Sequence, residues 1–116
     1  MASIKYLADN RHKMKRLVLA GGIFDVIHIG HINYFKKAKS LGDTLAVHIT
    51  EGKSFFNAKK RAAAISAIKF VDFVFIAPGD FCDKNILKKL KPDILMLNDG
   101  PDKFDCKGTV VFRKYF

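Results

Sequence analysis

The sequence predicts an α/β protein built on a Rossmann-like, doubly wound parallel sheet of five strands. Two observations lead to this fold class. Short, continuous apolar runs alternate with segments of helical periodicity, and several of the runs end at Gly, Pro or polar residues. Continuous apolar runs are typical of strands buried on both faces, and parallel strands need helical crossovers that cover the sheet on both sides. We expect residues 1–116 to form a single domain.

The expected elements follow from these patterns in chain order. Apolar runs predict strands at Arg16–Ala20, Thr44–Thr50, Phe73–Ala77, Ile94–Leu97 and Thr109–Phe112. Helical spacing predicts helices at His31–Leu41, Lys59–Phe70 and Asp83–Leu90. Gly21-Gly22 ends the first strand, Gly42-Asp43 closes the first helix as a C-terminal turn, and Asp83 caps the third helix. Residues 1–15 predict either a short helix or an irregular lead-in.

Composition and charge narrow the function classes. Hydrophobic residues make up 49% of the chain and charged residues 28%, which excludes a disordered protein. There is no apolar run of the ~18 residues that a membrane span requires and no signal peptide, so we expect a cytoplasmic protein without a membrane partner. A net charge of +10 attracts nucleotides, phosphorylated metabolites, nucleic acid or an anionic membrane surface, although a lysine-rich solvated surface explains it equally well. Two cysteines without metal-ligand spacing make a zinc site improbable.

The segment after the first strand carries the strongest signal for chemistry. It reads G-G-I-F-D-V-I-H-I-G-H over residues 21–31. The glycines let the backbone approach a ligand closely, and the start of the following helix favours an anion. His28 and His31 add N–H donors that can stabilise charge growing on a phosphate during phosphoryl transfer. The competing interpretation is that the two histidines only cap the helix and pack against it.

The run from Gly22 to His31, continued by Leu41-Gly42-Asp43, resembles the signature of the cytidylyltransferase-like nucleotidyltransferases over about residues 16–113. The family includes cytidylyltransferases for glycerol 3-phosphate, ADP-heptose-forming adenylyltransferases and FMN adenylyltransferases. The resemblance implies transfer of a nucleoside monophosphate from CTP or ATP to a phosphorylated small acceptor, with release of pyrophosphate. The letters HIGH at residues 28–31 also occur in class I aminoacyl-tRNA synthetases, but this chain is too short and has no KMSKS-like stretch.

The resemblance also implies roles for individual residues. His28 and His31 would be catalytic, and Asn98 and Asp99 would contact the acceptor unless they only form a polar turn. The residues implied in nucleotide binding are Gly22, Ile23, Phe24, Asp25, Gly30, Lys53, Lys60, Arg61 and Arg113. For the lysines a solvated surface is an equally good explanation. Asp43 matches a family aspartate that is expected to be structural.

The resemblance implies Mg²⁺ as cofactor and a homodimer as the assembly. No dense carboxylate cluster is visible, so we expect the phosphates of the ligand to supply most of the metal coordination and predict no protein metal ligand. Arg113 matches the arginine of a last family signature; we expect its Ser/Thr donors to follow beyond Phe116, the alternative being that this protein has lost them. Two alternatives remain at this stage: a non-catalytic nucleotide-binding module, and a basic nucleic-acid-binding domain, for which no recognised motif is present.

Overall fold

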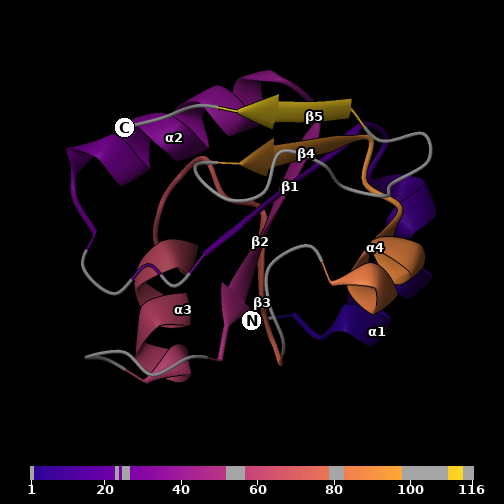
Figure 1. The fold of residues 1–116 in the computed structure, drawn as a ribbon, viewed down its shortest axis with the longest axis horizontal. Helices are drawn as coiled ribbons and strands as arrows, with labels where there is room; N and C mark the ends of the chain where they lie inside the picture. The colour runs from indigo at the N-terminus through magenta and orange to yellow at the C-terminus, as the bar shows by residue number, and fades with distance from the viewer. Residues whose placement is uncertain are drawn as a thin grey trace.

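Five parallel strands form one sheet in the structure, a computed structural model that describes residues 2–22, 24, 27–51, 57–78, 83–97 and 110–113 (of residues 97 and 110–113, the backbone only). The strands are β1 (Leu17–Gly22), β2 (Thr44–Thr50), β3 (Phe73–Ala77), β4 (Ile94–Leu97) and β5 (Val110–Arg113). Their order is β3-β2-β1-β4-β5, and every neighbouring pair is parallel (Figure 1). This is the Rossmann order, so the predicted sheet is confirmed.

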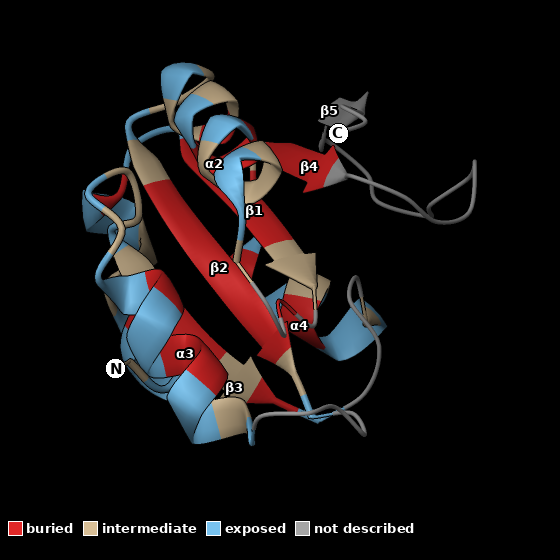
Figure 2. Cartoon of the chain, turned by 90° about the vertical axis from the view of Figure 1, so that its left-hand side faces the viewer, coloured by how far each residue is buried: buried red, intermediate tan, exposed pale blue. Residues whose placement is uncertain are grey.

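Helices cover both faces of the sheet. The helices are α1 (Ile4–Asp9), the 3₁₀ turn η1 (Arg11–Lys13), α2 (Ile29–Ser40), α3 (Ala58–Ser66) and α4 (Lys84–Leu90). One core lies between the sheet and α2 with α3, and a second lies between the sheet and α1 with α4. The strands between them are buried, while the outer faces of the helices are exposed (Figure 2). Among the described residues, no helix is long and apolar enough to span a membrane.

Several predicted boundaries need correction. The second predicted helix, Lys59–Phe70, ends at Ser66 instead, because the chain turns to bring Ile68 and Phe70 against the core before β3 begins. The first predicted helix starts at Ile29 rather than His31, and the first strand runs on through Gly22. Residues 2–13 contain α1 and η1, which decides in favour of a helical lead-in.

One side chain attaches this lead-in to the rest of the domain. The Arg11 guanidinium donates to the carbonyl oxygens of Leu90 at 2.7 Å and Lys91 at 2.8 Å, and to the Asp93 carboxylate at 2.9 Å. These acceptors lie where α4 ends and β4 begins. Arg11 therefore fastens η1 to the connection between α4 and β4, which explains why a polar segment at the start of the chain is folded.

Three aspartates that directly precede a strand join the sheet in the same way. The pairs are Asp43 with Arg16, Asp72 with Leu45, and Asp93 with Leu17. In each pair the aspartate N–H donates to the partner's carbonyl at 2.8–3.0 Å, and its Oδ2 accepts the partner's N–H at 2.8–3.1 Å. These exchanges fix strand register at the amino edge of the sheet. The structural role expected for Asp43 is thereby confirmed.

Candidate active site

The candidate site lies at the carboxyl edge of the sheet, where β1 ends and α2 begins. Parallel strands present their carboxyl ends, and the starts of the following helices, at the same edge. Gly22 is the last residue of β1, and Ile29 is the first of α2. This places the N-terminus of a twelve-residue helix, which favours anions, next to a glycine strand end.

His28 and His31 cap the start of α2 reciprocally. The His28 Nδ1 accepts the main-chain N–H of Gly30 at 3.0 Å, and the His31 Nδ1 accepts the main-chain N–H of His28 at 3.2 Å. The ring centroids are 4.1 Å apart. This is a capping box in which two imidazoles take the places usually held by a hydroxyl and a carboxylate. The interpretation that these residues cap the helix is thus correct for Nδ1 of each ring.

The caps determine the tautomer of both rings. Because each Nδ1 accepts a main-chain N–H, the neutral ring carries its hydrogen on Nε2. His28 is exposed and His31 is half-buried. Burial, and secondarily the nearby positive charge that His28 can carry, lowers the pKa of His31 from its ordinary 6.5. At neutral pH the site therefore offers a neutral imidazole whose Nε2–H is a donor.

Basic residues at the start of α3 add positive potential at the same edge. Asn57 caps this helix, accepting the Lys60 main-chain N–H at 2.9 Å, and its first turn contains no acidic residue. Lys59 and Lys60 are exposed, whereas Arg61 is only 2% exposed and donates to the Thr50 carbonyl, at the end of β2, at 2.9 Å. Cations at the positive end of a helix dipole repel it, and a bound anion relieves that repulsion.

The structure brings together part of the predicted site. Gly22, Phe24, His28, Gly30 and His31 lie in one segment between β1 and α2, with Phe24 buried behind the imidazoles. Lys60 and Arg61 lie at the start of α3, and Arg113 ends β5 beside Leu97. The remaining predicted residues, Ile23, Asp25, Lys53, Asn98 and Asp99, lie outside the described residues. Arg61 contacts the protein's own backbone, and its predicted contact with nucleotide stays a prediction.

His48 is a buried polar residue that was not predicted as part of any site. It lies on β2 opposite Gly21 of β1, its ring stacks on Phe75 at 5.1 Å, and its Nε2 is 3.1 Å from the Ala77 carbonyl oxygen. Burial lowers its pKa from 6.5, against the hydrogen bond of Ala77 and the charge of Asp83, which raise it. A histidine inside the run TLAVHIT was the signal that could have drawn attention to it.

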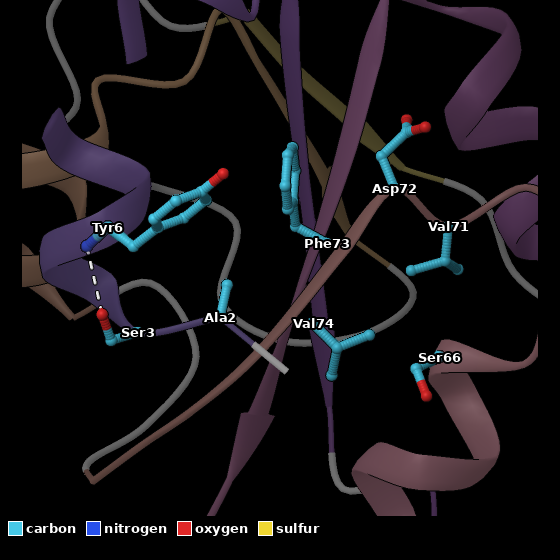
Figure 3. A pocket seen from close by; sticks show the side chains of 8 residues that line it. All are labelled: Ala2, Ser3, Tyr6, Ser66, Val71, Asp72, Phe73 and Val74. Atoms are coloured by element: carbon cyan, nitrogen blue, oxygen red, sulfur yellow. Dashed lines mark hydrogen bonds between the residues drawn. The ribbon is translucent and has the colours of Figure 1, made fainter. Parts of the chain in front are cut away.

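A cavity of about 550 Å³ lies elsewhere, at the edge strand β3 between α1 and α3 (Figure 3). Ser3, Tyr6, Ser66 and Asp72 contribute its polar side chains, and Asp72 directly precedes β3. The cavity is therefore at the amino edge of the sheet, the opposite edge from the imidazoles. Of the described residues that line it, none is Lys, Arg or His, so they do not supply the cations that a triphosphate requires.

Comparison with known proteins assigns the family. The model of the cytidylyltransferase-like family matches residues 19–108. FAD synthase of Thermococcus onnurineus is 37% identical over 109 residues, which cover 85% of this chain and 71% of that protein. FAD synthase of Pyrococcus abyssi is 41% identical over 78% of this chain and 66% of its own length. The bifunctional protein HldE of Campylobacter jejuni is 39% identical over 85% of this chain, which spans only 24% of HldE.

A solved structure shows the same fold. The crystal structure of the lipopolysaccharide core biosynthesis protein from Thermoplasma volcanium superimposes with a TM-score of 0.70 at 32% sequence identity, covering 85% of this chain and 95% of that one. The region that the family model matches, residues 19–108, includes the end of β1, the paired histidines and the helix that they cap. The chain therefore belongs to the cytidylyltransferase-like family, and it is a nucleotidyltransferase.

Proposed function

We propose that this chain transfers AMP from ATP to FMN, forming FAD and releasing pyrophosphate. The observation that carries the proposal is the pair of capped imidazoles at the start of α2, each presenting an Nε2–H donor. The choice of ATP and FMN is supported by the relatives named FAD synthase, at 37% and 41% identity. No relative reported above is named as a nucleic-acid-binding protein or as a non-catalytic module.

The chemistry needs charge stabilisation more than proton transfer. A phosphate oxygen of FMN attacks the α-phosphorus of ATP, the new P–O bond forms, and the bond to the bridging oxygen breaks, leaving its electron pair on pyrophosphate. The attacking oxygen is already anionic, so no general base is required. Negative charge grows on the equatorial oxygens of the α-phosphate. Donors from His28 and His31 would meet that charge, each worth about 3–4 kcal/mol by analogy with an oxyanion-hole donor.

The basic start of α3 fits the remaining phosphates. Lys59 and Lys60 are exposed in its first turn, without an acidic neighbour in that turn. A triphosphate held at the start of α2 would place its β- and γ-phosphates within the positive potential at this edge of the sheet. We expect these lysines to contribute to ATP affinity, and the imidazoles to contribute to turnover.

We also propose that Mg²⁺ enters the site with the triphosphate. The described residues do not fit a protein-bound Mg²⁺: they contain no group of three or more His, Cys, Asp or Glu side chains that could hold a metal. Imidazole nitrogen is a poor ligand for this hard cation, which prefers oxygen. The phosphates would therefore supply most of the coordination, and every step above is assigned to this chain's own residues.

A sugar phosphate is the second candidate acceptor. It is favoured by the match to a lipopolysaccharide core biosynthesis protein at 32% identity and by the match to HldE. From the family resemblance we further propose a homodimer acting in the cytoplasm, which light scattering of the purified protein and cell fractionation would test.

The decisive experiment is a grid of nucleotides against acceptors. Pyrophosphate release is measured for ATP, CTP, GTP and UTP with FMN, glycerol 3-phosphate and a set of sugar 1-phosphates, and FAD is identified by chromatography. We expect release with ATP and FMN together and none with either alone. Release with a sugar phosphate but not FMN would move the assignment to the second candidate. Nucleotide binding with no release in any combination would refute a transferase.

A further inference from the structure

We propose that Phe24 is a positioning residue that holds the ring of His31 in the orientation needed at the α-phosphate, an inference that rests on the function proposed above. Phe24 belongs to the segment between β1 and α2, yet the residue is buried, with 8% of its surface exposed. Its ring meets the His31 ring edge-on, with centroids 5.5 Å apart and planes at 80°. This is a favourable edge-to-face arrangement.

The backbone of Phe24 is in an unfavourable conformation. Its φ is +51°, in the left-handed region that bulky L-residues rarely adopt. In the described part of the chain the other non-glycine residues with positive φ are Lys15 and Lys91, and both are exposed. Such strain is typical of functional sites, where the surrounding structure enforces it.

Three neighbours enforce the ring position. At Gly22 a Cβ would lie 3.1 Å from Cζ and 3.2 Å from Cε2 of Phe24, closer than ordinary van der Waals contact, so the ring folds back tightly against the end of β1. On the other side the ring packs on Phe35 at 5.1 Å and on Tyr34 at 6.4 Å. Both are fully buried, and the Tyr34 hydroxyl is anchored to the Met96 carbonyl at 2.7 Å.

The helix geometry directs this support to His31. His31, Tyr34 and Phe35 are three and four positions apart on α2 and therefore share a face. Phe24 packs across that face, so its ring contacts the two buried aromatics and the imidazole together. His31 is then fixed by the His28 N–H at its Nδ1 and by the Phe24 ring packed against its own ring. A donor held in this way needs no reorganisation when charge develops on a phosphate.

The first test replaces the ring by an aliphatic side chain. In Phe24→Leu the site stays apolar, but the aromatic ring that packs against His31 is lost. We expect kcat to fall at least tenfold while KM for ATP changes less than threefold. The matched control is Phe75→Leu, which truncates a fully buried aromatic ring that stacks on His48 on the other face of the sheet. We expect this control to lose comparable stability and to keep kcat per folded molecule.

A second readout does not depend on turnover. Burial lowers the pKa of His31, so loss of the covering ring should raise it towards 6.5 in nucleotide-free protein, as followed by NMR titration. Gly22→Ala, whose new methyl group would displace the Phe24 ring, should raise it as well. An unchanged His31 pKa in both variants overturns the proposal, as does a kcat within twofold of wild type in Phe24→Leu.

The two proposals fail in different ways. If Phe24→Leu does not fold, the pKa of His31 in Gly22→Ala decides the positioning role. If the wild-type chain releases no pyrophosphate with any substrate pair, the proposed function fails, and the titration still reports whether Phe24 fixes the ring.

Discussion

The main-chain N–H of His28 donates to Nδ1 of His31 at 3.2 Å, so the second imidazole of the pair caps the residue that carries the first. Capping and catalysis are therefore not competing roles. In each ring Nδ1 accepts a main-chain N–H at the start of α2, and this places the hydrogen of the neutral ring on Nε2. We therefore expect loss of either ring to affect both helix stability and turnover, and suitable substitutions would separate the two effects.

We expect His28→Asn to separate them. Asparagine is a good N-cap, so α2 should remain capped and the melting temperature should change little. Without the imidazole donor, kcat should fall about 10²–10³-fold. His28→Ala should show the same loss of kcat and an added loss of about 1 kcal/mol of stability. Pyrophosphate release and thermal unfolding are measured on the same samples.

The control for that series is His12→Ala, which removes an exposed histidine of η1, a segment that leads into the amino end of β1. It should match wild type in kcat. Wild-type kcat in His28→Asn would show that the ring acts only as a cap.

Acid should weaken the fold through His48. Its pKa is lowered chiefly by burial, while in the unfolded chain it keeps the ordinary value of 6.5. As pH falls below 6.5, His48 binds a proton in the unfolded chain while it stays neutral in the folded chain. The free energy of unfolding therefore decreases from about pH 7 downwards. His31 acts in the same direction. Urea unfolding at pH 7.5 and 5.5 measures the decrease.

His48→Phe isolates this contribution, because the new ring can keep the stack on Phe75 without titrating. We expect the variant to be less stable at pH 7.5, because it loses the hydrogen bond to Ala77. Its free energy of unfolding should, however, decrease less between pH 7.5 and 5.5 than that of wild type. An equal loss in both proteins would exclude His48 as a source of acid sensitivity.

Asp93, which directly precedes β4, should contribute to stability over a different pH range. Burial alone would raise the pKa of Asp93, but hydrogen bonds from Leu17 and Arg11 and the charges of Arg11 and Arg16 outweigh it and lower the pKa below 3.8. The contribution is therefore complete above pH 3.8 and is lost as pH falls through the folded-state pKa. Asp93→Asn should cost about 1 kcal/mol at pH 7, measured by urea unfolding, because the side chain is 43% exposed and water screens part of the interaction.

Asp9→Asn is the matched control, since Asp9 is exposed at the end of α1. It should change stability by less than about 0.5 kcal/mol. Equal stability of Asp93→Asn and Asp9→Asn at pH 7 would contradict the anchoring role, whereas kcat per folded molecule should be unchanged in both.

Much of the fold could be predicted because local pattern and burial agree. The strands Thr44–Thr50, Phe73–Ala77 and Ile94–Leu97 were predicted to the residue, since each is an apolar run that directly follows an aspartate. The helix Lys59–Phe70 was predicted four residues too long at its end, because Ile68 and Phe70 continue the apolar pattern while packing from a turn. Periodicity records which residues are buried, and not which backbone conformation buries them.

The sequence indicated that His28 and His31 form a pair, but not the geometry of that pair. The spacing of His28 and His31 identified the pair, but the choice of Nδ1 as acceptor depends on where the main-chain N–H groups of the first turn point. The left-handed backbone of Phe24 depends likewise on the approach of α2 to the end of β1. Strand order, which places β1 at the centre, arises from pairing between distant segments and has no local signal.

Gly42 is expected to be intolerant of any side chain, for a reason that differs from the one its sequence position suggests. It follows the end of α2, but what excludes a side chain is close packing: a Cβ would lie 2.7 Å from the Arg16 carbonyl oxygen and 2.8 Å from Cγ2 of Val18. Because one of these atoms is backbone at the start of β1, relief requires the strand to shift. We expect Gly42→Ala to cost about 1–3 kcal/mol.

The measurement is chemical unfolding together with kcat per folded molecule, compared with Ser40→Ala two positions earlier, where the side chain is exposed. Ser40→Ala should be nearly neutral. Gly42→Ala should lower stability and leave kcat unchanged, because the altered contact lies at the amino edge of the sheet and the imidazoles lie at the carboxyl edge. A variant as stable as wild type would show that the turn after α2 can move away from β1, and the register contacts of Asp43 with Arg16 would then be dispensable.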